Sequence, residues 1–159
     1  MSAGINVKHL RKFVVTPTLR DIGLWSQEAE ELVLGTIAIE STMGYNIRQL
    51  GNEYARGLGQ CEPPTFEWLV YDYLLAKHPD LYAKISRVCG IDKYKIEYLD
   101  WNLALAVALI RVRYLPAPGK IPQELAGQAA YWKKYYNASP NGRSAQDYIR
   151  IYDRLVRQA

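Results

Sequence analysis

The feature that most constrains the fold of this chain is an uninterrupted apolar run at residues 103–110, Leu-Ala-Leu-Ala-Val-Ala-Leu-Ile. Leucine and alanine favour helix, and a helix with no polar face must be covered on all sides by other elements. The run is far shorter than the roughly 20 residues that span a bilayer, so it predicts a buried helix and no membrane span. We expect this central helix to begin near Glu97 or Asp100 and to end at about Leu115, before Pro116.

The remaining apolar pattern predicts amphipathic helices around this central one. Ser26 is a good N-cap for a helix over 27–43, and Ser144 for a last helix. Further helices are expected over 63–77, 80–89 and 123–137, and residues upstream of Ser26 look like a looser lead-in. Between residues 45 and 64 the apolar period is lost and glycines appear, which predicts turns and a short hairpin at about 54–60. The predicted fold class is mainly α, a single compact helical domain.

Composition limits the possible functions. The 159 residues, 49% of them apolar, suit one domain over 1–159 with a core of about 18–157. A net charge of +4 is mild, and the cations are scattered among acids, which does not favour a nucleic-acid binder. Cys61 and Cys89 form no metal motif and are expected to be free thiols, although one bridge between them stays open; no metal or other cofactor is expected.

The basic N-terminal residues 1–12 lack the apolar core and cleavage site of a secretory signal peptide. We therefore expect the chain to be synthesised in a cytoplasm. Neither of its two histidines is paired with a nucleophile, so the sequence does not favour catalysis by a serine or cysteine triad.

Glu40 is the strongest candidate for chemistry. It continues the apolar row of the helix predicted over 27–43, so its carboxyl should face inward near the helix C-terminus. Burial and the negative end of the helix dipole both raise the pKa of a carboxyl group. A carboxylic acid that stays protonated near neutral pH suits a general acid for glycosidic cleavage, while a structural, hydrogen-bonded carboxylate is the alternative.

Other short motifs follow Glu40 in a fixed order. They are Glu40-Ser41 with Gly44, Gly57-Leu58-Gly59-Gln60 with Pro63 or Pro64, Asn102 and Ala106 leading to Tyr114-Leu115, and Tyr136-Asn137-Ala138 with Pro140 and Gly142. In this order they resemble the motifs of lytic transglycosylases and the related goose-type lysozymes, over roughly residues 32–142. The chain departs from that pattern at Gly59, where the family often has methionine, and at Tyr135 and Ser139.

The resemblance implies a lysozyme-like α+β fold with a small loop or hairpin lobe after the catalytic helix, and a bacterial or bacteriophage origin. It implies that Glu40 protonates the β-1,4 bond between N-acetylmuramic acid and N-acetylglucosamine in peptidoglycan. The enzyme would then reach the bacterial cell wall through phage lysis or with a virion. The residues implied in holding the sugar or the glutamate are Ser41, Gly57, Leu58, Gly59, Gln60, Asn102, Tyr114, Tyr136 and Asn137. Trp132, Tyr135 and Tyr136 are candidates for a wall that faces the glycan.

The resemblance leaves the reaction type open. In a transglycosylase the muramoyl 6-hydroxyl is the nucleophile and no second carboxylate is needed. Goose-type enzymes carry additional acids in the loops after the catalytic glutamate, and here Glu53 and Glu62 stand in similar places. Either could activate water in an inverting hydrolase, or both could be surface acids. A noncatalytic glycan-binding or virion structural domain is the third alternative.

Overall fold

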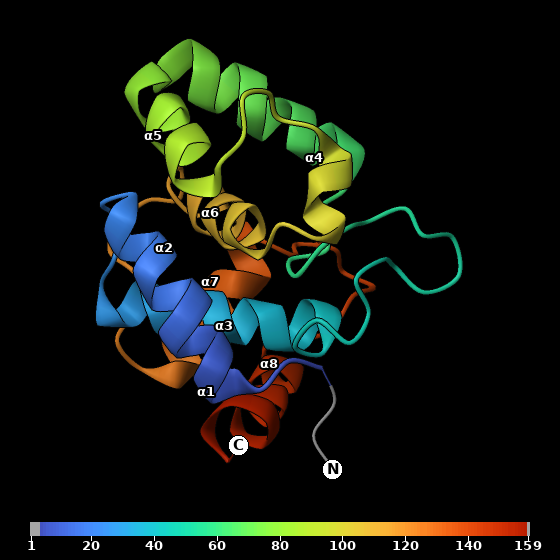
Figure 1. Ribbon diagram of the computed structural model, residues 1–159. Coiled ribbons are helices and arrows are strands. Elements are labelled where there is room, and N and C mark those ends of the chain that lie inside the picture. The colour runs from blue at the N-terminus through green and yellow to red at the C-terminus, as the bar shows by residue number, and fades with distance from the viewer. Residues whose placement is uncertain (1–3, 159) are drawn as a thin grey trace.

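Helix α6 (Leu103–Arg113) lies at the centre of the protein, with the other helices packed around it (Figure 1). In this computed structural model, which describes residues 4–158, every side chain from Leu105 to Ile110 is buried. α6 contacts elements from both halves of the chain, including α2, α3 and α5. The predicted central helix is confirmed, but it begins later than expected, because the Asn102 side chain caps it by accepting the N–H of Leu105.

Helix α3 (Gln27–Ser41) carries Glu40 in its last turn. The Ser26 side chain caps its first turn by accepting the N–H of Ala29, as predicted. The helix ends two residues earlier than predicted, because Thr42 and Met43 already adopt left-handed conformations, with φ of 53° and 58°. Left-handed backbone strains residues other than glycine, so the turn directly after Glu40 is held by its surroundings.

The N-terminal segment is helical, so the expected looser lead-in was wrong. α1 (Val7–Leu10), the π-helical η1 (Arg11–Val15) and α2 (Thr16–Asp21) follow one another without a break. Their inward face buries a row of apolar side chains, Val7, Leu10, Val15 and Leu19. This segment is tied to α3 at the Glu30 carboxylate, which accepts hydrogen bonds from Arg11, Thr16 and Trp25.

A second group of helices lies above α6 in Figure 1. It consists of α4 (Pro63–Glu67), the π-helical η2 (Trp68–Leu75), α5 (Pro79–Cys89) and the 3₁₀ turn η3 (Ile96–Asp100). The predicted helices over 63–77 and 80–89 are confirmed, and Gly90 ends α5 with φ of 69°. Cys61 and Cys89 are both free thiols.

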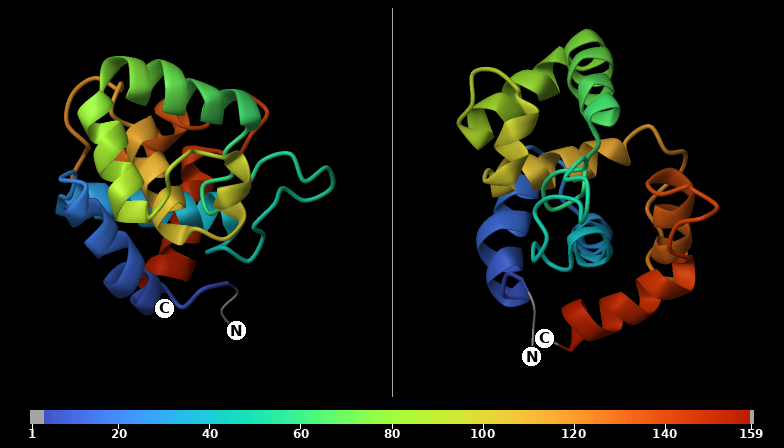
Figure 2. Two further views of the ribbon diagram at one scale, coloured as in Figure 1. Left: turned by 45° about the horizontal axis from the view of Figure 1, so that its top comes forward. Right: turned by 90° about the vertical axis from the view of Figure 1, so that its right-hand side faces the viewer.

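The C-terminal helices cover the other side of α3. α7 (Leu125–Tyr135), α8 (Ala145–Tyr152) and the π-helical η4 (Asp153–Arg157) agree with the predicted helices, and Ser144 forms a capping box with Asp147 at the start of α8. In the right-hand view of Figure 2, α3 is seen nearly end-on, with α1 and α2 on one side and α7 and α8 on the other. The result is a compact, mostly helical single domain in which α3 lies between these two groups of helices.

Residues 45–60 form the loop that projects from the domain in Figure 1. The very short hairpin expected at about 54–60 is reduced to one antiparallel bridge between Arg56 and Cys61, beside a second bridge between Arg48 and Arg56, and no extended strand occurs within residues 4–158. The base of the loop is fixed by Asp100, whose carboxylate pairs with Arg48 at 2.7 Å and Arg56 at 3.4 Å.

Because the described residues form helices and no extended strand, the predicted mainly α class is correct.

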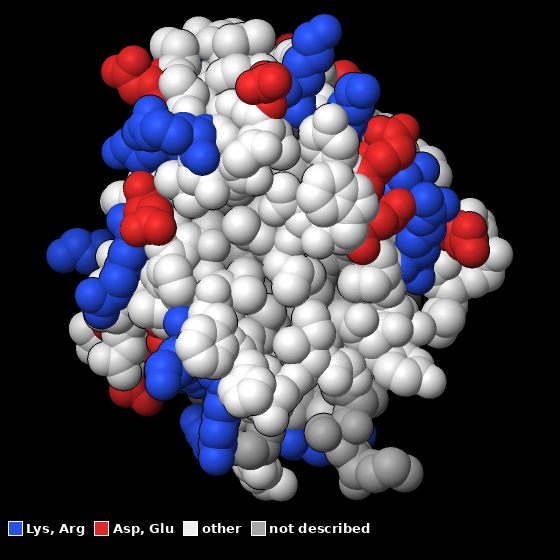
Figure 3. All heavy atoms as spheres, in the orientation of Figure 1, with Lys and Arg blue, Asp and Glu red and all other residues white. Residues whose placement is uncertain are grey.

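The outer surface shows acidic and basic side chains close to one another around a largely uncharged centre on the face in Figure 3. Within residues 4–158 no helix is both long and apolar enough to cross a membrane.

Candidate active site

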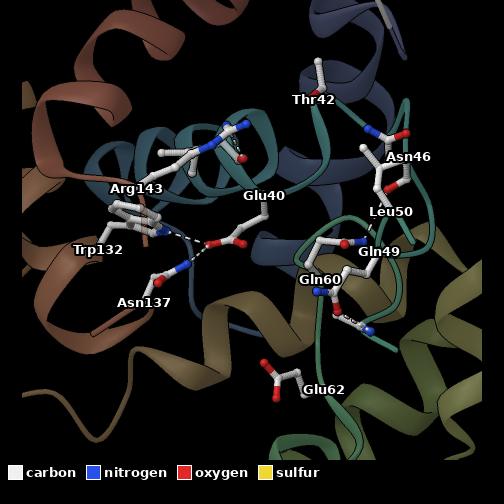
Figure 4. A pocket seen from close by; sticks show the side chains of 12 residues that line it. Glu40, Thr42, Asn46, Gln49, Leu50, Gln60, Glu62, Trp132, Asn137 and Arg143 are labelled. Atoms are coloured by element: carbon white, nitrogen blue, oxygen red, sulfur yellow. Dashed lines mark hydrogen bonds between the residues drawn. The ribbon is translucent and has the colours of Figure 1, made fainter. Parts of the chain in front are cut away.

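A cavity of about 440 Å³ opens at the C-terminal end of α3, with the Glu40 carboxyl in its wall (Figure 4). Its walls come from the end of α3, the loop 42–60, the start of α4, and α7 with the loop after it. The lining residues are Ile39, Glu40, Thr42, Asn46, Gln49, Leu50, Ala55, Gln60, Glu62, Trp132, Asn137 and Arg143. Most of these carry polar groups, so the cavity suits a hydroxylated ligand.

Glu40 is held through one of its two oxygens. Oε2 accepts hydrogen bonds from the indole Nε1 of Trp132 at 3.1 Å and from the amide Nδ2 of Asn137 at 3.3 Å. Oε1 accepts no hydrogen bond from any residue within 4–158, and the carboxyl points toward the centre of the cavity in Figure 4. One oxygen is therefore positioned while the other is available to a ligand.

The electrostatics of Glu40 favour its protonated form. Burial raises the pKa of the carboxyl above its ordinary value. The hydrogen bonds from Asn137 and Trp132 and the charges of Arg113 and Arg143 lower this pKa, but they offset the effect of burial only in part. Burial disfavours the charged form because the protein solvates a carboxylate less well than water does. A carboxyl group with a raised pKa at the edge of a cavity is a typical arrangement for a proton donor.

The position of Asn137 is set by the contacts of the preceding residue. The Tyr136 carbonyl accepts a hydrogen bond from Arg113 at 2.6 Å, and the Arg113 guanidinium lies 4.1 Å from the centre of the Tyr136 ring. The Tyr136 hydroxyl donates to the Gly59 carbonyl at 2.6 Å. These contacts fix the end of α7 against the glycine turn and so hold the Asn137 amide beside Glu40.

The loop 138–143 is also tied down close to the cavity. The Lys133 ammonium donates to the carbonyls of Ser139 at 2.7 Å and Arg143 at 2.8 Å. Arg143 in turn donates to the Ile39 carbonyl at 3.1 Å, which places its positive charge beside the last turn of α3. This charge would stabilise Glu40 once the carboxyl has lost its proton.

Gln60 lines the cavity and also holds the loop together. Its side-chain nitrogen donates to three backbone carbonyls, those of Asn46, Ile47 and Gly57, at 3.1 to 3.3 Å. The donor capacity of this amide is therefore used within the protein. Its side-chain oxygen accepts no hydrogen bond from residues 4–158 and could accept one from a ligand.

Seven other residues that the motifs indicate lie outside the lining of the cavity. They are Ser41, Gly57, Leu58, Gly59, Asn102, Tyr114 and Tyr136. The Ser41 hydroxyl is fully buried and accepts the N–H of Gly44, which stabilises the end of α3. Tyr114 is buried with its hydroxyl 2.7 Å from that of Thr36. In this structure these residues pack in the interior or stabilise helix ends and turns rather than face the cavity.

The two candidates for a second carboxylate differ in position. Glu62 lines the cavity and is exposed, and its carboxylate is separate from that of Glu40 in Figure 4. Glu53 does not line the cavity; its side chain is 68% exposed and lies 3.6 Å from Arg48. The structure therefore brings Glu62, but not Glu53, to the same cavity as Glu40.

Sequence reasoning missed several residues of the cavity, including Arg143, Thr42, Asn46 and Gln49. They lie in loops, where no hydrophobic period marks which side chains point inward. Trp132 was considered as part of a wall, but its ring is fully buried and only its N–H reaches Glu40. No cluster of metal-ligating side chains occurs in the described part of the chain.

Comparison of the chain with protein-family models and with curated proteins gives no match. The resemblance to lytic transglycosylases therefore depends on the short motifs and their order alone.

Proposed function

We propose that this protein is a peptidoglycan-cleaving enzyme of the lysozyme superfamily, acting at the bacterial cell wall as a lytic transglycosylase with Glu40 as its general acid. The observation that carries the proposal is the environment of Glu40: a carboxyl with a raised pKa, positioned through Oε2 and open to a polar cavity through Oε1. The motif order supplies the substrate class.

In the proposed reaction a muramyl glycosidic oxygen lies beside Glu40 Oε1. This oxygen accepts the proton of the Glu40 carboxyl as its bond to the anomeric carbon of the muramic acid breaks. The resulting carboxylate then accepts the proton of the muramoyl 6-hydroxyl as that oxygen bonds to the anomeric carbon. The products are a 1,6-anhydromuramic end and a free 4-hydroxyl on the leaving sugar. Glu40 ends the cycle protonated, so neither water nor a second carboxylate enters the reaction.

The hydrogen bonds to Oε2 support both halves of this cycle. The donors Trp132 and Asn137 keep the carboxyl in one orientation before transfer and stabilise the carboxylate after it. Arg143 and Arg113 add positive charge in the second state. Gln60, Asn46 and Gln49 would then bind the hydroxyl and acetamido groups of the sugars.

An inverting hydrolase is a second candidate, favoured by the presence of Glu62 in the same cavity. There Glu62 would act as a base that activates water on the face of the sugar opposite Glu40. The two reactions differ in their products, since hydrolysis leaves reducing ends.

The test is digestion of isolated cell walls by the purified protein, with mass spectrometry of the released muropeptides. Transglycosylation predicts 1,6-anhydromuramic ends, unchanged in Glu62→Gln. Hydrolysis predicts reducing ends and a loss of release in Glu62→Gln. Glu40→Gln is the matched control, since it keeps the shape and hydrogen-bonding capacity of the side chain but removes the acid. Equal release by Glu40→Gln and the unchanged protein would refute the assignment of Glu40.

A further inference from the structure

A second cavity, also of about 440 Å³, lies at the other end of α3 and shares no lining residue with the first. It is enclosed by the start of α3, the end of α6, the segment 117–123 and α7. Glu28 in this cavity and Glu40 in the first are twelve residues apart on one helix. At a rise of 1.5 Å per residue this separation is about 18 Å, so the two cavities can bind different ligands.

Arg111 is the distinctive group of this second cavity. Its Nε donates to the Leu24 carbonyl at 3.1 Å, whereas its two terminal nitrogens make no hydrogen bond within residues 4–158. It also forms no salt bridge with any residue in that range. Arg111 therefore presents a guanidinium with most of its donors unused at a cavity wall.

The surroundings of Arg111 leave its charge uncompensated. Burial lowers the pKa of the guanidinium, and the groups that oppose this effect are the hydroxyls of Tyr131 and Tyr73. Burial also raises the pKa of both hydroxyls, so they are neutral near pH 7. A partly buried charge without a partner is costly, and an anion bound beside it would remove that cost.

The rest of the lining indicates what kind of anion fits. Its charged residue types are Arg111, Lys120 and Glu28, which give a formal net charge of 2 − 1 = +1. Leu115 and Tyr131 add apolar surface. A planar carboxylate matches the fork of a guanidinium with two parallel hydrogen bonds, and its single charge matches that of the wall.

We propose that this cavity binds a small carboxylate-bearing ligand, such as the C-terminal end of a short peptide, through the terminal nitrogens of Arg111. Lys120 on the rim attracts the anion, and the apolar side of the ligand lies against Leu115 and Tyr131. The site is separate from the cavity around Glu40, and the proposal does not depend on the activity assigned there.

The experiment is a titration of the ¹⁵N-labelled protein followed by NMR, with N-acetylalanine as the probe. The expected result is saturable shifts of the Arg111 Nε–H signal and of the backbone amides of residues 117–123. N-acetylalanine methylamide, which has the same shape without the charge, is the matched control and should cause no such shifts. Inorganic phosphate forms a third arm that separates a carboxylate site from a general anion site.

Variants locate the site. Arg111→Gln should weaken binding of N-acetylalanine at least tenfold, and Arg111→Lys, which keeps the charge and loses the fork, should weaken it to a smaller extent. Should Arg111→Gln fail to fold, the Arg111→Lys variant and the shifts in the unchanged protein still decide the question. Shifts elsewhere, equal shifts with the methylamide, or binding of phosphate alone would each overturn the proposal.

Discussion

Replacing Gly59 by alanine tests how the glycine turn supports the candidate site. A Cβ on Gly59 would lie 2.5 Å from Ile110 Cγ1 and 2.5 Å from the Tyr136 hydroxyl oxygen. Overpacking of this kind costs ~1–3 kcal/mol. Displacing Tyr136 also weakens its hydrogen bond to the Gly59 carbonyl, which contributes ~0.5–1.5 kcal/mol. We therefore expect Gly59→Ala to lower the free energy of unfolding by ~1.5–4.5 kcal/mol.

Urea unfolding followed by tryptophan fluorescence measures this change. In thermal unfolding, at ~2–4 °C per kcal/mol for a chain of this size, the melting temperature should fall by ~3–18 °C. In a double-mutant cycle, Tyr136→Phe should recover part of the loss by removing the hydroxyl that the new methyl meets. A loss in Gly59→Ala below ~1 kcal/mol would refute this reasoning.

Three further predictions concern the electrostatics of the site and its loop. Glu40→Gln should reduce muropeptide release at least ~100-fold. It should also raise the urea midpoint of unfolding at pH 7, because it removes a carboxyl whose ionisation is disfavoured by burial. An unchanged midpoint would contradict this effect of burial. Asn137→Ala removes a hydrogen-bond donor to the ionised Glu40 carboxylate, so the pKa of Glu40 should rise further. The alkaline limb of the pH–activity profile should then move to higher pH, and a shift to lower pH would contradict this role of Asn137. Asp100→Asn removes the carboxylate that pairs with Arg48 and Arg56, so hydrogen exchange of the amides in residues 45–56 should become faster while α6 stays protected.

The sequence predicts the helices well because their signals are local. Ser26, Gly90 and Ser144 mark helix ends in the structure as they do in the sequence. The N-terminal helix was not predicted, because it is stabilised mainly by contacts with distant parts of the chain rather than by a local sequence pattern. Its apolar row packs on α3 and α6, and Arg11 finds its partner Glu30 on another helix.

The cavity is predictable only in part, for a similar reason. Glu40 stands out because a charged residue in an apolar helical row has a cost that local sequence reveals. Asn137 was indicated by the motif order, but its contact with Glu40 depends on how α7 ends. Arg143 and Thr42 had no local signal, since their positions follow from the left-handed turn after α3 and from the Lys133 contacts of the opposite loop.

The Glu40 carboxyl links the stability of the fold to the proposed chemistry, because its pKa affects both. The pKa of Glu40 is raised in the folded protein, so the group contributes most favourably to folding below its unfolded pKa. That contribution is lost as the pH rises through the folded pKa, because the folded protein must then hold a charge in a poorly solvated place. The stability gained by Glu40→Gln should therefore be small in acid and grow toward neutral pH, which urea midpoints at pH 4 and pH 7 would show. A gain that was larger in acid would mean that Trp132, Asn137 and the two arginines outweigh burial, and the carboxyl would then be a permanent anion rather than a proton donor.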